Sequence, residues 1–286
     1  MLRRRFHAMG TGMELVLDAR PTAVAMHALA SAEAELHRLE RLLSRFDPGS
    51  ELSRLNERET TTVGPELLEV TELAVAARER TGGRFDPTVH DALVAAGYDR
   101  TFDRVPRLGD APAGTAPCGG GIVVDRTRAT IELEPGVRLD LGGIGKGYAA
   151  DRAAALLAAA GPCLVDAGGD IAVEGRPWPI GVETADGTLT LELPRGGLAT
   201  SGRDRRRWTR AGNEQHHLVD PRTGRPSESD VLRVTVAAAS AAEAEVLAKA
   251  LFFAGSSDAL READAHAIPA VIVTADGRTL RSGALG

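Results

Sequence analysis

The stretch Leu139-Asp-Leu-Gly-Gly-Ile-Gly-Lys-Gly-Tyr-Ala-Ala-Asp151 is the most informative part of this chain. Its apolar start predicts a short strand, Val137–Leu141, and its alanines predict a helix that runs to Ala160 after a glycine turn. Glycine leaves the backbone open to a ligand, the first turn of a helix carries N–H groups without helical partners, and Lys146 adds a positive charge. The stretch therefore predicts a phosphate-binding turn.

Other glycine-rich motifs were weighed against this turn. A Walker A loop is excluded, because Asp140 stands where that motif needs glycine and Gly147 stands where it needs a hydroxyl. Gly145-x-Gly147-x-x-Ala150 fits the fingerprint of a dinucleotide-binding fold, and Asp166 ends an apolar run about 20 residues further on. A plain glycine turn with a solvated lysine fits as well. The stretch alone leaves these last two interpretations open.

The composition indicates a globular protein. The chain has 286 residues, of which 43% are hydrophobic, and this is enough for one large domain or two small ones. The net charge of −6 argues against nucleic acid as a partner. No apolar run reaches the length of a membrane span, and no signal-peptide segment follows the basic N-terminus. Cys118 and Cys163 are too few for a disulfide scaffold, so we expect a cytoplasmic location without membrane insertion.

The order of predicted elements favours an α+β fold. Apolar residues at helical spacing predict a helix from near Pro21 to Leu43, and a second helix is expected over Pro65–Arg80. Ser240 and Glu243 form a capping box that predicts a helix ending near Phe253. Strands cluster and do not alternate strictly with helices, which favours a mixed sheet with flanking helices over a doubly wound sheet. The other predicted strands are Met13–Asp18, Gly121–Asp125, Ala129–Leu133, Leu164–Asp166, Ile171–Val173, Thr188–Leu193, Val231–Ala238 and Ala270–Thr274.

Three further segments carry residue types that can do chemistry. Thr81–Thr88 places Phe85 and Asp86 between a glycine helix stop and a proline. His216–Arg225 joins two histidines, which can take up a proton near neutral pH, to an Asp-Pro turn. Phe46–Asn56 offers a ring that can stack on a flat ligand. Taken alone, each segment is also explained by an ordinary turn, an incidental histidine or a core ring.

Taken together and in this order, the segments resemble the FAD:protein FMN transferases, the ApbE-like family. Eight ordered motifs carry the resemblance, span almost the whole chain and make the dinucleotide-binding interpretation a distant alternative. They are Met9-Gly-Thr11, Phe46 with Ser50–Arg54, Gly83–Thr88, Leu139–Ala149, Gly168–Asp170, Ala199–Gly202, His217–Gly224 and Ala244–Leu251. The resemblance implies a single domain over residues 1–286 with the α+β, T-fold-related architecture of that family.

The resemblance also implies a function. An enzyme of this family takes FAD as substrate, splits its pyrophosphate with Mg²⁺ and moves FMN to a threonine of an acceptor flavoprotein, releasing AMP. By position in the motifs, FAD binding is assigned to Met9, Phe46, Arg84, Phe85, Asp86, Asp140, Lys146 and Val219, and catalysis to Lys146 and His217. Phosphoryl transfer requires positioning and charge neutralisation, which suits Lys146. For His217, proton transfer at the acceptor hydroxyl and stabilisation of the transition state stay open.

Two other functions remain compatible with the same residues. One is an FAD-binding protein of this fold without transferase activity. The other is a pyrophosphatase that converts FAD to FMN and AMP with water in place of the acceptor.

The metal site departs from the family pattern. The resemblance places Mg²⁺ on the backbone carbonyl of Gly143 and on an aspartate and a threonine at the positions of Glu245 and Lys249. Glutamate keeps an oxygen ligand, whereas a protonated lysine cannot ligate a hard cation and repels it. The sequence leaves open whether Mg²⁺ binds to Gly143 and Glu245 or whether Lys249 takes its place.

Overall fold

The computed structural model describes residues 1–285 and divides into two compact units. Unit 1 comprises Met1–Glu40, Ile144–Ser201 and Ser229–Gly286, and unit 2 comprises Arg41–Gly143 and Gly202–Glu228. Unit 1 therefore contains Lys146 and Glu245, and unit 2 contains Asp140 and His217.

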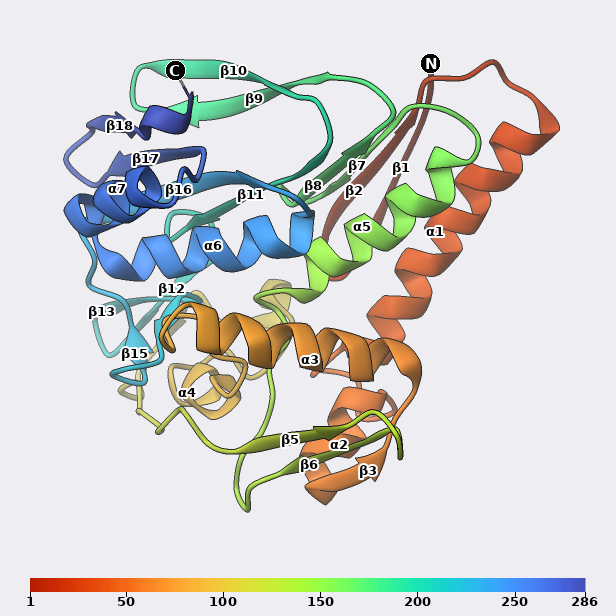
Figure 1. The fold of residues 1–286 in the computed structure, drawn as a ribbon. Helices are drawn as coiled ribbons and strands as arrows, with labels where there is room; N and C mark the ends of the chain where they lie inside the picture. The colour runs from red at the N-terminus through yellow and green to blue at the C-terminus, as the bar shows by residue number, and fades with distance from the viewer. Residues whose placement is uncertain (286) are drawn as a thin grey trace. The chain divides into compact units, whose positions relative to one another are not determined.

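Unit 1 is built on an eight-stranded sheet in the order β1-β2-β7-β8-β11-β16-β17-β18 (Figure 1). The pairings of β1 with β2, β2 with β7, β7 with β8 and β16 with β17 are all antiparallel. The edge strand β1 exposes Arg3 and Arg5, and such charges discourage pairing with other chains. The strands are β1 (Leu2–Ala8), β2 (Thr11–Leu17), β7 (Cys163–Ala167), β8 (Ile171–Glu174), β11 (Gly196–Gly202), β16 (Val231–Ala238), β17 (Ala270–Thr274) and β18 (Thr279–Arg281).

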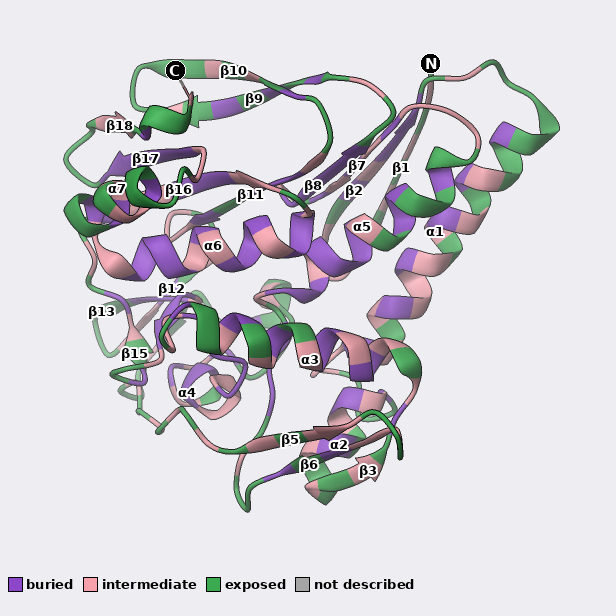
Figure 2. Ribbon diagram, in the orientation of Figure 1, coloured by how far each residue is buried: buried purple, intermediate pink, exposed green. Residues whose placement is uncertain are grey.

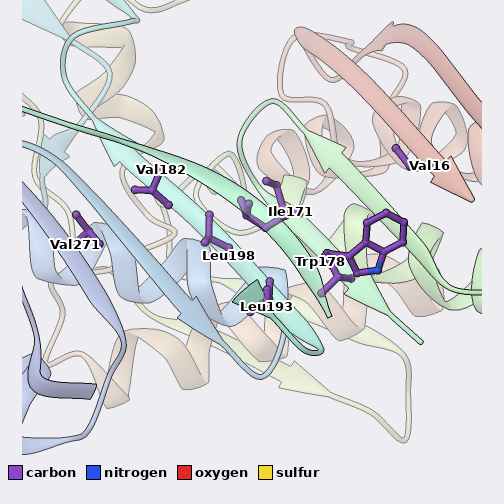
Figure 3. Packing of buried hydrophobic residues seen from close by; sticks show 9 residues of the cluster. Val16, Ile171, Trp178, Val182, Leu193, Leu198 and Val271 are labelled. Atoms are coloured by element: carbon purple, nitrogen blue, oxygen red, sulfur yellow. The ribbon is translucent and has the colours of Figure 1, made fainter. Parts of the chain in front are cut away.

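A hairpin packs its apolar side chains against this sheet. Strands β9 (Trp178–Thr184) and β10 (Gly187–Leu193) pair antiparallel, and their buried residues include Trp178 and Leu193. These side chains form one cluster with Ile171 and Leu198 of the sheet (Figure 3). The alternation of buried and exposed residues along β9 is the period expected of a strand with one face in the core.

The helices of unit 1 include the two that carry the candidate charged residues. Helix α5 (Gly145–Ala158) lies against β7 and β8, and α6 (Ala241–Ala254) lies against β16. Most of α6 is buried, which explains why its sequence is apolar nearly all round (Figure 2). The remaining helices are α1 (Ala23–Leu43), whose residues to Glu40 belong to this unit, α7 (Ser256–Ala265) and the 3₁₀-helix η2 (Gly283–Leu285).

Unit 2 consists of short helices and small sheets. An apolar cluster of Leu93, Tyr98, Trp208 and Val219 forms part of its core. One three-stranded sheet has the order β3-β6-β5, a second, mixed sheet has the order β13-β12-β4, and β14 pairs with β15. The elements are α2 (Glu51–Arg58), α3 (Pro65–Arg80), α4 (His90–Ala95), η1 (Phe102–Arg104), β3 (Thr60–Thr62), β4 (Leu108–Gly109), β5 (Ile122–Asp125), β6 (Thr130–Leu133), β12 (Arg207–Arg210), β13 (Asn213–His216), β14 (Val219–Asp220) and β15 (Arg225–Pro226).

The α+β prediction is confirmed, and one predicted strand is wrong. Val137–Leu141 has no strand pairing. Leu139 donates its amide to Asn56 Oδ1 at 2.7 Å, and its carbonyl accepts from Asn56 Nδ2 at 2.9 Å. A side chain on α2 thus satisfies the backbone groups that a neighbouring strand would otherwise have paired. Within residues 1–285, no helix has the length and apolar character needed to cross a membrane.

Candidate functional site

Four charged side chains of unit 1 form the lysine–carboxylate cluster: Lys146, Asp170, Glu245 and Lys249. Lys146 Nζ lies 2.5 Å from Glu245 Oε1 and 2.7 Å from Asp170 Oδ2. Lys249 Nζ lies 3.2 Å from the same Glu245 oxygen. The side chain of Glu245 is 1% exposed and that of Asp170 5%, whereas those of Lys146 and Lys249 keep 15% and 16%. The carboxylates are therefore buried, and the two lysine side chains are the more exposed members of the cluster.

The cluster forms because the first turns of α5 and α6 meet (Figure 1). A Cβ on Gly147 would lie 2.4 Å from the carbonyl oxygen of Ala241, so only glycine permits this approach. The backbone N–H groups at the start of each helix donate hydrogen bonds to a carboxylate on the other helix. Gly147 N donates to Glu245 Oε2 at 2.9 Å, and Ala241 N and Ala242 N donate to the Asp151 carboxylate at 2.8 and 3.0 Å. These bonds satisfy N–H groups that lack helical partners.

This arrangement corrects one part of the sequence prediction. The amide of Gly147 is not open to a phosphate, because Glu245 accepts it. Lys146 is not a solvated lysine either, since two carboxylates hold its ammonium group. The turn is a preorganised charged centre, and it depends on Glu245 of α6, which lies far from the turn in the sequence.

The two buried carboxyls have opposite pKa shifts. Burial acts to raise the pKa of Glu245, but the Lys146 and Lys249 ammonium groups outweigh it and hold that pKa at about 2. Burial and the nearby Glu245 charge raise the pKa of Asp170 to about 6, against the opposing effect of Lys146. At neutral pH both carboxyls are ionised, so the two lysines and two carboxylates carry no net formal charge.

A second buried ion pair lies in unit 2, in the Arg45 cluster of Arg45, Phe46, Tyr98 and Asp140. Arg45 Nε lies 2.5 Å from Asp140 Oδ2, and the two side chains are 6% and 8% exposed. Arg45 also donates through Nη2 to the Tyr98 carbonyl at 2.7 Å. Its guanidinium carbon lies 4.2 Å from the Phe46 ring centre and 4.7 Å from that of Tyr98. Asp140 Oδ1 accepts the amide of Gly142 at 2.7 Å.

The turn after α3 is held by its own side chains. Asp86 Oδ1 accepts the amide and the hydroxyl of Thr88 at 2.8 and 2.7 Å, and Asp86 Oδ2 lies 3.3 Å from Arg78 Nε. Phe85 is 3% exposed, so its ring lies in the core and presents no stacking face. Arg84 Nε donates to the Thr81 carbonyl at 3.1 Å. Arg84 is partly exposed, whereas Phe85 and Asp86 are buried.

The two histidines have different surroundings. His216 is buried and donates through Nε2 to the Ser227 carbonyl at 2.9 Å, while its Nδ1 accepts the amide of Leu218 at 3.3 Å. Burial lowers the pKa of His216, which fits a neutral structural ring. His217 is partly exposed, and its amide donates to Arg206 at 3.2 Å. His217 is therefore the more exposed of the two histidines.

The other predicted residues occupy backbone-defined positions. Met9 lies in the turn between β1 and β2 with a φ of 51°, and its amide donates to Glu40 Oε1 at 2.5 Å. Val219 is buried in β14 opposite Pro226. Gly143 is the last residue of the first segment of unit 2.

A sequence model described as the ApbE family matches residues 9–272. The chain belongs to this family. An FAD:protein FMN transferase of Rhodobacter capsulatus is 31% identical over 95% of this chain, and the chain spans only 55% of that relative's length. An FAD:protein FMN transferase of Treponema pallidum is 29% identical over 84% of this chain and 75% of its own.

Solved structures of ApbE proteins have the same fold. The ApbE protein of Thermotoga maritima has a TM-score of 0.83 at 27% identity, and the alignment covers 99% of this chain and 97% of the other. The flavinyl transferase ApbE of Pseudomonas stutzeri in its apo form also has a TM-score of 0.83, at 26% identity, with coverage of 99% and 95%. The expected ApbE-like architecture is thereby confirmed.

The residues at the expected ApbE metal position do not fit Mg²⁺. Glu245 Oε1 contacts two ammonium groups and Oε2 accepts an amide, so hydrogen-bond donors occupy both oxygens. Lys249 offers no lone pair while protonated. Across the described residues 1–285, no group of three His, Cys, Asp or Glu side chains is arranged to hold a metal ion.

Sequence reasoning missed Arg45 and Asp151 and left Asp170 without a role. Asp170 stands in a quoted motif, so its contact with Lys146 had a signal. Arg45 adjoins the predicted ring of Phe46 but resembles any surface arginine in sequence. Only the packing of Tyr98 shows that it is buried.

Proposed function

We propose that this chain transfers FMN from FAD to a threonine hydroxyl of an acceptor flavoprotein and releases AMP. The support is family membership over residues 9–272, together with relatives from Rhodobacter capsulatus and Treponema pallidum that bear this activity in their names. The observation that carries the proposal is that the ApbE fold extends over 99% of the chain, with Lys146 held at the start of α5.

The proposed reaction is a phosphoryl transfer. The threonine oxygen forms a bond to the phosphorus of the FMN half of FAD. The bond from that phosphorus to the bridging oxygen breaks, and AMP leaves with the electron pair. The hydroxyl proton passes to a base, and we assign this role to His217. Lys146 holds a positive charge at the start of α5, which suits the charge that develops on transferring oxygens.

The FAD-binding assignments are proposals of the same kind. They comprise Met9, Phe46, Arg84, Phe85, Asp86, Asp140, Lys146 and Val219. The partly exposed ring of Phe46, braced by Arg45, supports a stacking role. The buried Phe85 and Val219 support a role for their backbone groups only. Mg²⁺ has no part in this proposal, because the oxygens of Glu245 are already engaged.

We further propose that both units act as one functional domain over residues 1–286, in the cytoplasm. A single family match that includes residues of both units supports the first point. Two free cysteines, Cys118 and Cys163, are compatible with a reducing compartment. Fractionation of cells that express the chain tests the location.

The test of the function is product analysis. Purified protein is incubated with FAD, with and without an acceptor domain whose threonine lies in a flavinylation sequence, and the products are separated by chromatography. Fluorescent, FMN-bearing acceptor together with AMP is the expected result. FMN and AMP without acceptor indicate a pyrophosphatase, and bound FAD released intact in both arms indicates a binding protein without transfer.

Two variants check the assigned roles. Lys146→Met is expected to lower the rate of transfer about 100-fold or more, by analogy with removal of one charge-stabilising donor. His217→Gln is expected to lower it by about 100-fold as well and to remove the acid limb of the pH profile. FAD binding by His217→Gln at wild-type affinity separates a catalytic from a binding role.

A further inference from the structure

The lysine–carboxylate cluster has a feature that a metal site lacks. Glu245 Oε1 contacts the ammonium groups of both Lys146 and Lys249, at 2.5 and 3.2 Å, and its Oε2 accepts the amide of Gly147. A divalent cation at this carboxylate would meet two fixed ammonium groups, and Coulomb repulsion at such distances is strong in a buried site.

The charges of the cluster also balance without a metal. The buried carboxylates of Asp170 and Glu245 are matched by the two lysines. The two lysine side chains are the more exposed members of the cluster, so they are also the members better placed to meet an anion from the solvent.

We propose that the cluster is a metal-free anion site, in which the ammonium group of Lys249 occupies the role of the divalent cation and, with Lys146, binds the pyrophosphate of the substrate. The identification of the anion as a pyrophosphate rests on the proposed function. The exclusion of a metal ion rests on the contacts of Glu245 alone. FAD binding by this chain is then independent of Mg²⁺.

The first test uses Mn²⁺ as probe and needs no FAD. Metal-stripped wild-type protein is titrated with Mn²⁺, and bound ion is followed by electron paramagnetic resonance. In the wild-type protein, we expect no bound Mn²⁺ that Mg²⁺ can displace. Lys249→Thr, which removes the ammonium group and adds a hydroxyl, is expected to gain a site for such an ion. Arg261→Thr, an exposed change on α7, is the matched control for loss of one positive charge and is expected to gain none.

The second test measures FAD affinity in EDTA and in Mg²⁺ by flavin fluorescence. Wild type is expected to bind equally in both. Lys249→Thr is expected to lose about tenfold in EDTA, because a charge-assisted contact is removed, and to regain affinity in Mg²⁺. Lys249→Arg, which keeps the charge, is expected to bind within about threefold of wild type in EDTA. Circular dichroism confirms that each variant is folded.

Three outcomes overturn the proposal. These are a stoichiometric Mn²⁺ site in wild type that Glu245→Gln abolishes, failure of Lys249→Thr to gain Mn²⁺, and wild-type FAD affinity of Lys249→Thr in EDTA. If wild type binds no FAD in either buffer, the proposed function fails, and the Mn²⁺ titration alone decides between a metal site and a metal-free cluster.

Discussion

The two buried charge clusters, one in each unit, differ in the number of cations that serve each carboxylate. Lys146 and Lys249 both contact Glu245, and Lys146 also contacts Asp170. In the Arg45 cluster, one guanidinium pairs with Asp140 between two aromatic rings. Loss of Glu245 leaves two ammonium groups with one carboxylate, whereas loss of Arg45 leaves a single buried carboxylate without its cation. The difference lies between a network of several charges in unit 1 and a single pair that braces Phe46 in unit 2.

The largest effect is expected from Glu245→Gln, because both lysines contact this carboxylate. The change leaves two ammonium groups with one carboxylate in a buried site, and the free energy of unfolding is expected to fall by about 4 kcal/mol. Urea denaturation followed by circular dichroism measures it. Glu192→Gln, an exposed carboxylate on β10, is the control and is expected to stay within about 0.5 kcal/mol of wild type. A loss below about 1 kcal/mol for Glu245→Gln would show that the cluster is not a cooperative network.

The next effect concerns the lone pair of unit 2. Arg45→Met leaves the buried Asp140 carboxyl without its cation, at an expected cost of about 3 kcal/mol. Asp140→Asn made in the Arg45→Met background is expected to recover about 1 kcal/mol or more, because it removes that uncompensated charge. A double-mutant cycle of urea denaturation measures the coupling. Additive losses within about 0.5 kcal/mol would mean that the two side chains do not stabilise each other.

The sequence predicted the elements whose signals are local. Helix α3 has the predicted bounds Pro65–Arg80, because proline at its first turn and glycines after its end mark both limits. Strands β16 and β17 also match their predicted ranges, since each is rich in β-branched residues. The strand predicted over Val137–Leu141 failed because Asn56, far away in the chain, takes its hydrogen bonds.

The candidate site was predictable only in part, because its contacts also join residues that lie far apart in the chain. Gly147 and Lys146 indicate a charged turn from the sequence alone. The carboxylate that accepts hydrogen bonds from both residues lies on α6, and the local spacing of residues does not connect that helix to the turn. Glu245 and Lys249 stand four residues apart on α6, so their contact follows from helix geometry alone. Their junction with Lys146 depends on the approach of Gly147 to Ala241, which only tertiary packing reveals.

A smaller effect is expected from Gly147→Ala, which tests that approach directly. The added Cβ would lie 2.4 Å from the Ala241 carbonyl oxygen, which is backbone and cannot rotate away. Separation of α5 from α6 is expected to cost about 2 kcal/mol and to weaken the contact of Lys146 with Glu245. Gly12→Ala in β2 is the matched control, because nothing lies within 4 Å of its added Cβ. Equal thermal stabilities of the two variants would contradict the close packing of the helix starts.

The smallest effect is expected at an exposed carboxylate, which tests whether burial sets the size of the others. Asp230 accepts the amide of Ser256 at 2.9 Å and its hydroxyl at 2.5 Å, at the start of α7.

The bonds to the Ser256 hydroxyl and amide lower the pKa of Asp230 below its ordinary 3.8. A lowered pKa means that the ionised carboxylate stabilises the fold above about pH 4, and that this contribution disappears as the pH falls through the lowered value. Because Asp230 is exposed, Asp230→Asn is expected to cost only about 0.5 kcal/mol at pH 7 and less than that near pH 2. Urea denaturation of both proteins at the two pH values measures the difference. A cost at pH 7 as large as that of Arg45→Met would show that hydrogen bonding, and not burial, sets the strength of these carboxylates.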